Sequence, residues 1–133
     1  MKRLADERGT VSTFVAVITV AMLMAAGLAV DGGRKIAALR EATHIADNAA
    51  RAGAQAIDVD TLRTTGVLLV DPDVAVAEAD AYLASLGHRG QIQVSGDTVT
   101  VTVSITVDAV LLPVGEITVT ATETAAAVNE EPG

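Results

Sequence analysis

The chain has 133 residues, half of them apolar, and a formal net charge of −8. The absence of cysteine excludes a disulfide scaffold and a thiolate zinc site. With an acidic balance, no Trp, one Phe and one Tyr, the chain lacks the basic face and the stacking platform of nucleic-acid-binding proteins, so we expect no nucleic-acid partner. The acidity is confined to one part. Residues 52–133 hold twelve acidic residues against two basic ones, a net of −10, whereas residues 10–30 hold no charge.

Residues 10–30 predict a transmembrane helix. At 1.5 Å per residue, residues 11–30 would cover roughly 30 Å, about one hydrocarbon core. The alternative is a cleaved signal peptide, because Gly27-Leu28-Ala29 could precede a cut. The apolar run is longer than that class of peptide uses, and two acids precede it, so the span is favoured. Residues 1–9 would then be a cytoplasmic leader.

Small residues recur within this span at every fourth position. Such spacing lets two helix backbones approach closely in lipid, where van der Waals contact drives association, although a general abundance of Ala would produce the same pattern. We therefore predict a helix-packing face formed by Ala21, Ala25 and Ala29. The span has no ionisable side chain, which argues against a proton or ion pathway.

Residues 31–57 predict a helical stem. Asp31-Gly32-Gly33 indicates a kink or break, although the residues leave open whether the helix runs on through the two glycines. Residues 34–57 lack proline and are rich in helix formers. An Ala seam buries little area per residue, so it needs a neighbour, either the chain's own sheet or another subunit. The predicted seam consists of Ala38, Ala42, Ile45, Ala49, Ala52 and Ala56.

Two motifs flank this region, Ala29-Val30-Asp31-Gly32-Gly33-Arg34 and Ala46-Asp47-Asn48-Ala49-Ala50-Arg51-Ala52-Gly53-Ala54, and Glu7-Arg8-Gly9 precedes the span. Over residues 6–57 the chain resembles the TadE/TadG-like proteins of tight-adherence (Flp) pilus assembly. The positions that carry the motifs are Asp31, Gly33, Arg34, Asp47, Ala49 and Ala50. The resemblance implies a single-pass, pilin-like structural or assembly component of the bacterial cytoplasmic membrane. Its partners would be the membrane, other pilin-like or Tad assembly proteins, and further copies of the chain.

Processing at Gly9-Thr10 is the point where the chain departs from related precursors. Class IV pilin-like precursors carry a glycine cleavage site and a glutamate at the fifth position after it. Counted from Gly9, that position is Phe14, and no carboxylate lies between Glu7 and Asp31. This departure favours an uncleaved, TadG-like anchor over a true pilin.

Residues 58–133 predict a small extracytoplasmic head, so the whole chain is α+β: a transmembrane helix, an Ala-rich stem, then a helix-plus-antiparallel-sheet head. Asp71-Pro72 begins the head's helix and Gly87 ends it. Its apolar stripe would be Ala75, Val76, Ala79, Tyr82, Leu83 and Leu86. Strands are expected over 91–95, 98–107 and 116–122, with a two-residue turn at Gly96-Asp97 and a further short strand over 67–70.

Two features of the head could carry function. The apolar loop 109–114 would either tuck under the sheet or touch a membrane or a partner. The Thr-rich strand 98–107 is expected to be a plain paired strand of the sheet, although at an edge it could accept a strand from another subunit. A small secreted or anchored binding domain that uses the strand edge or the apolar loop is thus the alternative function.

Catalytic chemistry is not indicated. The carboxylate pairs Asp58/Asp60 and Asp71/Asp73 lack the spacing of a calcium loop and are expected to cap helices and turns. The serines and the two histidines show no triad spacing. We therefore expect neither an enzyme nor a cofactor.

Overall fold

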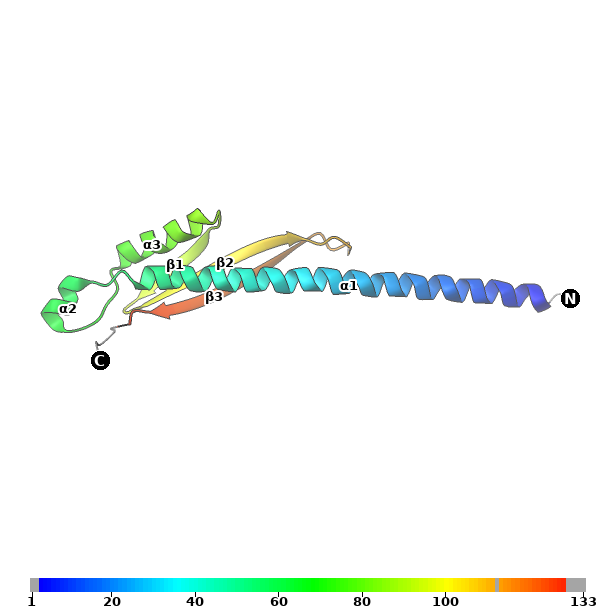
Figure 1. Cartoon of the computed structure of the whole chain (residues 1–133), viewed down its shortest axis with the longest axis horizontal. Coiled ribbons are helices and arrows are strands. Elements are labelled where there is room, and N and C mark those ends of the chain that lie inside the picture. Colours follow the sequence, from blue (N-terminus) through cyan, green and yellow to red (C-terminus); the bar gives the residue numbers. More distant parts are fainter. Residues whose placement is uncertain (1–2, 112, 129–133) are drawn as a thin grey trace. The chain divides into compact units, whose positions relative to one another are not determined.

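The computed structural model describes residues 3–111 and 113–128. Their elements are, in chain order, α1 (Arg3–Ala54), α2 (Val59–Thr65), α3 (Pro72–Ser85), β1 (Gly90–Ser95), β2 (Thr98–Asp108) and β3 (Glu116–Ala126) (Figure 1). The α+β class is confirmed, with a long apolar N-terminal helix followed by a small helix and a three-stranded antiparallel sheet. The chain divides into two compact units. The first is the part up to Ile36 together with Val107–Ile117, and the second is the remainder.

Helix α1 runs unbroken through Gly32-Gly33, so the predicted kink or break is wrong. Two helical glycines cost about 2 kcal/mol relative to two alanines. Neither glycine adopts a positive φ, and good helix formers lie on both sides of the pair. We attribute the continuity of the helix to tertiary contacts, described below, that hold the segments on either side of the two glycines. The helix ends at Ala54, slightly before the predicted end of the stem.

A short helix, α2, was not expected from the sequence. Asp58 caps its N-terminus, and Gly66 ends it with φ 72°, donating its N–H to the carbonyl of Leu62 at 2.9 Å. The strand predicted over 67–70 is reduced to a single bridge between Ile57 and Val70. The cap role expected for Asp58 is confirmed.

Helix α3 begins and ends where the sequence indicates. The Asp71 carboxylate accepts hydrogen bonds from the N–H groups of Asp73 and Val74 at 3.1 and 3.2 Å, and Pro72 occupies the first turn. The buried face is narrower than the predicted stripe. It consists of Ala75, Ala79 and Leu83, while Tyr82 is half-buried and Val76 and Leu86 are exposed. This row makes the contacts of α3: Ala75 and Ala79 lie against Gly53 of α1, and Leu83 lies against Gly90 of β1.

The sheet has the order β1-β2-β3. The β1–β2 hairpin pairs Ser95 with Thr98 and turns at Gly96, whose φ of 62° is the left-handed value that the predicted turn requires. Because β2 is the central strand, the hypothesis that it is an edge open to another subunit is wrong. The edges are β1 and β3.

The core of the second unit lies between the stem part of α1, helix α3 and one face of β2 (Figure 1). Val99, Val101 and Val103 are fully buried on that face, as the alternation predicts. The approach of α1 is close. A methyl group at Gly53 would lie 3.0 Å from both the Ala75 carbonyl oxygen and Val99 Cγ1. The neighbour that the Ala seam requires is therefore the chain's own sheet and α3.

The other face of β2 carries a ladder of hydroxyl pairs with β3. Each pair is joined by one hydrogen bond of 2.8–2.9 Å. The pairs are Thr100–Thr124, Thr102–Thr122, Ser104–Thr120 and Thr106–Thr118. Cross-strand Thr pairs of this kind stabilise a sheet, which accounts for the regular Thr alternation without an intermolecular role.

Candidate functional site

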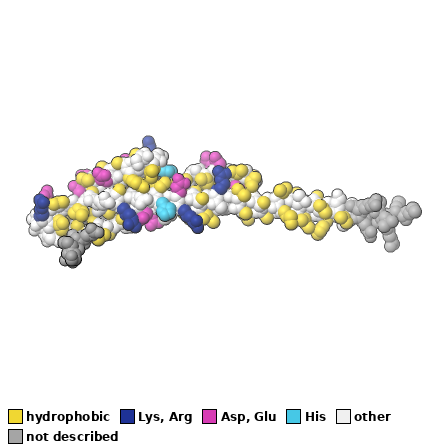
Figure 2. Space-filling view, in the orientation of Figure 1, with side chains coloured by type: hydrophobic (Ala, Val, Ile, Leu, Met, Phe, Trp, Pro, Cys, Tyr) yellow, Lys and Arg dark blue, Asp and Glu magenta, His cyan; other side chains and the backbone are white. Residues whose placement is uncertain are grey.

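The apolar segment of α1 is open to its surroundings. From Val11 to Val30 its large apolar side chains are 39–68% exposed, and Figure 2 shows them as a run of hydrophobic surface. The helix is long and apolar enough to cross a membrane by length and composition, and its most apolar 18-residue window is 6% buried. A core helix of a soluble protein would be mostly buried, so the segment fits membrane anchoring.

Two hydroxyl groups of this segment donate hydrogen bonds within the helix itself. The Thr13 hydroxyl donates to the carbonyl of Gly9, and the Thr19 hydroxyl donates to that of Val15, each at 2.8 Å. Such bonds make hydroxyls tolerable in lipid. Gly9 and Thr10, the candidate processing positions, are exposed within the unbroken helix.

The predicted packing face of the span is exposed as well. Ala21, Ala25 and Ala29 all lie on the surface of α1. Gly27 lies on the opposite side, because two residues correspond to about 200° of rotation around an α-helix. Association of the Ala face with a partner helix stays a prediction.

Asp31, the first residue of the Asp-x-Gly-Arg motif, has a definite structural partner. Its side chain is 2% exposed, and its carboxylate accepts hydrogen bonds from the N–H groups of Val110 and Leu111 at 3.0 and 3.1 Å. The sequence singled out Asp31 through the motif but gave no reason for it. The structure supplies one: Asp31 binds the backbone of the β2–β3 loop.

Gly27 lies one helical turn before Asp31 on the same side of α1. It is buried, and a methyl group there would lie 3.1 Å from Leu111 Cβ. The loop therefore rests on the Gly27–Asp31 side of the helix. It does not tuck under the sheet, since Val110, Leu111 and Val114 are 57–61% exposed. Contact of the loop with a membrane or a partner stays a prediction.

The remaining motif positions divide into surface and core. Gly33 and Arg34 are exposed. Asp47 forms an ion pair with Arg51 at 3.0 Å on the helix surface, an arrangement worth about 0.3–0.5 kcal/mol. Ala49 and Ala50 are fully buried in the second unit's core. The second motif thus places small residues where α1 meets the sheet and α3.

The stem seam lies on the buried side of α1, and its residues Ile45 and Ala49 belong to the same core. Ala38, Ala42, Ile45 and Ala49 are buried, and Ala52 and Ala56 are half-buried. A strict alternation of four and three missed Ala46, Ala50 and Ala54, which are also buried. The sequence held a signal for this wider buried face in two adjacent pairs of small residues, Ala49-Ala50 and Gly53-Ala54. Adjacent small residues widen the helix face that can closely approach another element.

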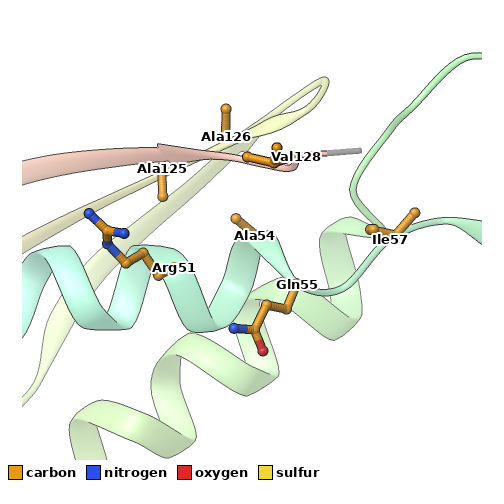
Figure 3. A pocket seen from close by; sticks show the side chains of 7 residues that line it. All are labelled: Arg51, Ala54, Gln55, Ile57, Ala125, Ala126 and Val128. Carbon is orange, nitrogen blue, oxygen red and sulfur yellow. The ribbon is translucent and has the colours of Figure 1, made fainter. Parts of the chain in front are cut away.

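A hollow of about 580 Å³ lies between the end of α1 and the end of β3 in the second unit. Figure 3 shows Arg51 reaching from α1 toward Ala125 of β3. The lining is mostly small and apolar: Arg51, Ala54, Gln55, Ile57, Ala125, Ala126 and Val128. Among the described residues, Arg51 is the one charged group of the lining, and it already pairs with Asp47. The described lining therefore offers no acid–base pair and no nucleophile.

Metal-ligating side chains do not gather in the part of the chain that the structure describes: no group of three or more His, Cys, Asp or Glu residues is placed to hold an ion. The carboxylates of Asp58 and Asp71 are instead engaged with helix N-termini. The Thr61 hydroxyl donates to Asp58 at 2.6 Å, and this hydrogen bond lowers the pKa of that carboxyl below its ordinary value.

Comparison with known proteins gives one match. Residues 9–56 match a family model described as "Putative Flp pilus-assembly TadE/G-like", which confirms the resemblance predicted from the motifs. No curated protein and no solved structure matches the chain. The family is one of pilus-assembly components, not of enzymes. The span, the Asp31 motif and the Ala-rich stem thus form a segment similar to the TadE/G-like family, and this match supports a role in pilus assembly.

Proposed function

We propose that the chain is a membrane-anchored, pilin-like structural or assembly component of a Tad (Flp)-type pilus. Residues 10–30 would span the bacterial cytoplasmic membrane once, with residues 1–9 inside and with the stem 31–57 and head 58–133 outside. The observation that carries the proposal is the exposed, uncharged apolar surface of α1 inside the matched segment. The acidic residues of the head, residues 58–133, would then lie in water, where charged groups are favourably hydrated.

Assembly would proceed through helix packing of the span. The β2–β3 loop occupies the Gly27–Asp31 side of α1, and Ala21, Ala25 and Ala29 remain exposed on another side. Small residues spaced by four allow a second helix to approach closely in lipid. The partner would be another pilin-like or Tad assembly protein, or a second copy of this chain.

The anchor would remain uncleaved. Phe14 stands where related precursors carry glutamate, and it is 63% exposed on the helix. Residues 10–30 carry no carboxylate that could pair with the new amino terminus of a neighbouring subunit in lipid. This absence of a pairing group supports an assembly component over a processed filament subunit.

Intact mass spectrometry of the chain expressed in a bacterium, combined with alkaline extraction of membranes, tests the anchor. We expect the mass of the unprocessed chain in the extracted membrane pellet. A soluble protein beginning near Val30 would overturn the proposal in favour of a secreted binding domain. A membrane protein beginning at Thr10 would contradict the uncleaved anchor and indicate pilin-like processing.

The packing face has a matched control. Ala16 lies nine residues before Ala25, which places it on the opposite side of the helix, and both are exposed. We expect Ala25→Leu to reduce chemical cross-linking between spans in membranes, and Ala16→Leu to leave it unchanged. Equal cross-linking in wild type and both variants would refute packing through the Ala face without affecting the anchor.

A further inference from the structure

We propose that the tip of the β2–β3 hairpin, described over residues 109–111 and 113–115, inserts into the membrane leaflet on the head side, beside the spanning helix. We further propose that Asp31 holds the tip at that depth. The occupant of the exposed apolar loop is then lipid acyl chains. This inference rests on the proposed membrane span and extends it from one membrane-contacting element to two.

The position of the loop along α1 supports this depth. Leu111 contacts Gly27, which lies three residues before Val30, the last residue of the uncharged segment, or about 4.5 Å along the helix axis. Leu28 and Val30 at the same level of α1 are 64% and 48% exposed. A membrane that covers these helix residues also covers the loop that rests beside them.

The composition of the loop suits an apolar surrounding. Residues 109–115 contain no charged side chain, and the nearest charges are Asp108 and Glu116 at its two ends. Val110, Leu111 and Val114 direct more than half of their surface outward. Exposure of this cluster to water is unfavourable. Its transfer into the leaflet gains the same free energy per unit of apolar area as the transfer of the span. The two flanking acids limit insertion to the tip.

Three backbone N–H groups of the loop have hydrogen-bond acceptors within the protein. An unpaired N–H or C=O group in hydrocarbon costs several kcal/mol, so irregular backbone is tolerated in lipid only where it finds partners. The N–H groups of Val110 and Leu111 donate to the buried Asp31 carboxylate, and Ala109 donates to the Gly115 carbonyl at 2.9 Å. Pro113 has no N–H to satisfy.

Asp31 is therefore a positioning residue. A carboxylate at the end of a span would ordinarily face water, yet this one is 2% exposed because the loop covers it. Both of its oxygens accept hydrogen bonds from the loop. Removing the carboxylate would leave two loop N–H groups without these acceptors, and the tip would move toward water, where its N–H groups can be solvated.

The absence of cysteine allows single-site labelling of the full chain. An environment-sensitive fluorophore is attached at Val114→Cys in the loop, at Met24→Cys in the span, and at Leu86→Cys on α3. All three positions are exposed and apolar, at 61%, 67% and 48%. The variants are reconstituted in vesicles of phosphatidylethanolamine and phosphatidylglycerol with brominated acyl chains, and quenching by bromine is compared with quenching by aqueous iodide.

We expect bromine quenching and a blue-shifted emission at Val114→Cys and Met24→Cys, and iodide quenching at Leu86→Cys. Quenching of the Met24 label by bromine while the Val114 label is quenched by iodide would overturn the inference and leave the anchor intact. A Val114 label shielded from both quenchers would also overturn it, because protein would then cover the loop. A label at Met24→Cys that bromine does not quench would refute the membrane span itself.

The role of Asp31 is tested in the same vesicles. Asp31→Ala is expected to abolish bromine quenching of the Val114 label while bromine quenching of the Met24 label persists. Asp31→Asn keeps one oxygen acceptor, so we expect it to retain part of the bromine quenching of the Val114 label. Asp47→Ala serves as the control, since it removes a surface carboxylate of the same helix. Unchanged quenching in Asp31→Ala, with an unchanged circular dichroism spectrum, would refute the positioning role.

Discussion

Replacing Ala49 with leucine tests whether the stem packs against the chain's own sheet or against another subunit. Ala49 is fully buried in the core that α1 forms with α3 and β2. Three additional carbon atoms have no space there, because α1 is already closely packed one turn further on. A methyl group added at Gly53 would lie 3.0 Å from both the Ala75 carbonyl oxygen and Val99 Cγ1. The larger side chain must therefore push α1 away from the sheet or distort its neighbours.

Overpacking of a well-packed core costs about 1–3 kcal/mol, and we expect the upper end here because three carbons are added. In a unit of this size, about 3 kcal/mol corresponds to a decrease in Tm of roughly 12–24 °C. The measurement is thermal unfolding in detergent, followed by circular dichroism and by the emission of Tyr82. Tyr82 is the chain's one tyrosine, and it packs against this core.

Ala37→Leu is the matched control, since Ala37 lies on the same helix but is exposed. It should leave the Tm nearly unchanged. If Ala49→Leu also left the Tm unchanged, the stem would not pack on its own sheet. The Ala seam would then be available to another subunit, and the packing described for the second unit would be refuted.

Three further perturbations test separate parts of the fold. Leu83→Ala should cost about 2–5 kcal/mol by leaving a cavity, seen as a lower urea midpoint with an unchanged slope; an unchanged midpoint would contradict the burial of α3. Gly90→Ala would place a methyl group 2.7 Å from the Thr102 carbonyl oxygen, so amide exchange at the start of β1 should accelerate, and undisturbed protection would show that the strands can separate freely. The pKa of Asp58 is below its ordinary value, so the cap stabilises α2 fully above the unfolded pKa and is lost as pH falls through the lower folded pKa. A carboxyl NMR titration should show this low pKa, and Thr61→Val should bring it back toward the ordinary value; no change would exclude the Thr61 hydroxyl as the cause.

The local elements follow from the sequence because each depends on nearby residues. Asp71-Pro72 caps and begins α3, Gly96 supplies the positive φ of the hairpin turn, and the strict alternation over 98–107 indicates a strand with one buried face. The uncharged run 10–30 is equally local, since length and composition suffice to indicate a helix that can span a membrane.

The continuity of α1 could not be predicted in this way. Gly32-Gly33 weakens a helix locally, and local propensity therefore indicated a break. The helix continues because Asp31 binds the β2–β3 loop before the glycines and the Ala-rich stem packs into a core after them. The Asp31 contacts join residues 79 and 80 positions apart in the chain, beyond the reach of any periodicity.

The sequence by itself determined the separation of an uncharged apolar segment, residues 10–30, from a strongly acidic one, residues 52–133, and its two motifs indicated the TadE/G-like resemblance. Only the tertiary structure decided what the motif residues contact. Asp31 binds the hairpin loop, and Ala49 and Ala50 belong to the chain's own core. The physical reason is that a short residue pattern specifies which face of a helix can be approached closely. The element that approaches it is chosen by long-range packing of β2, β3 and α3.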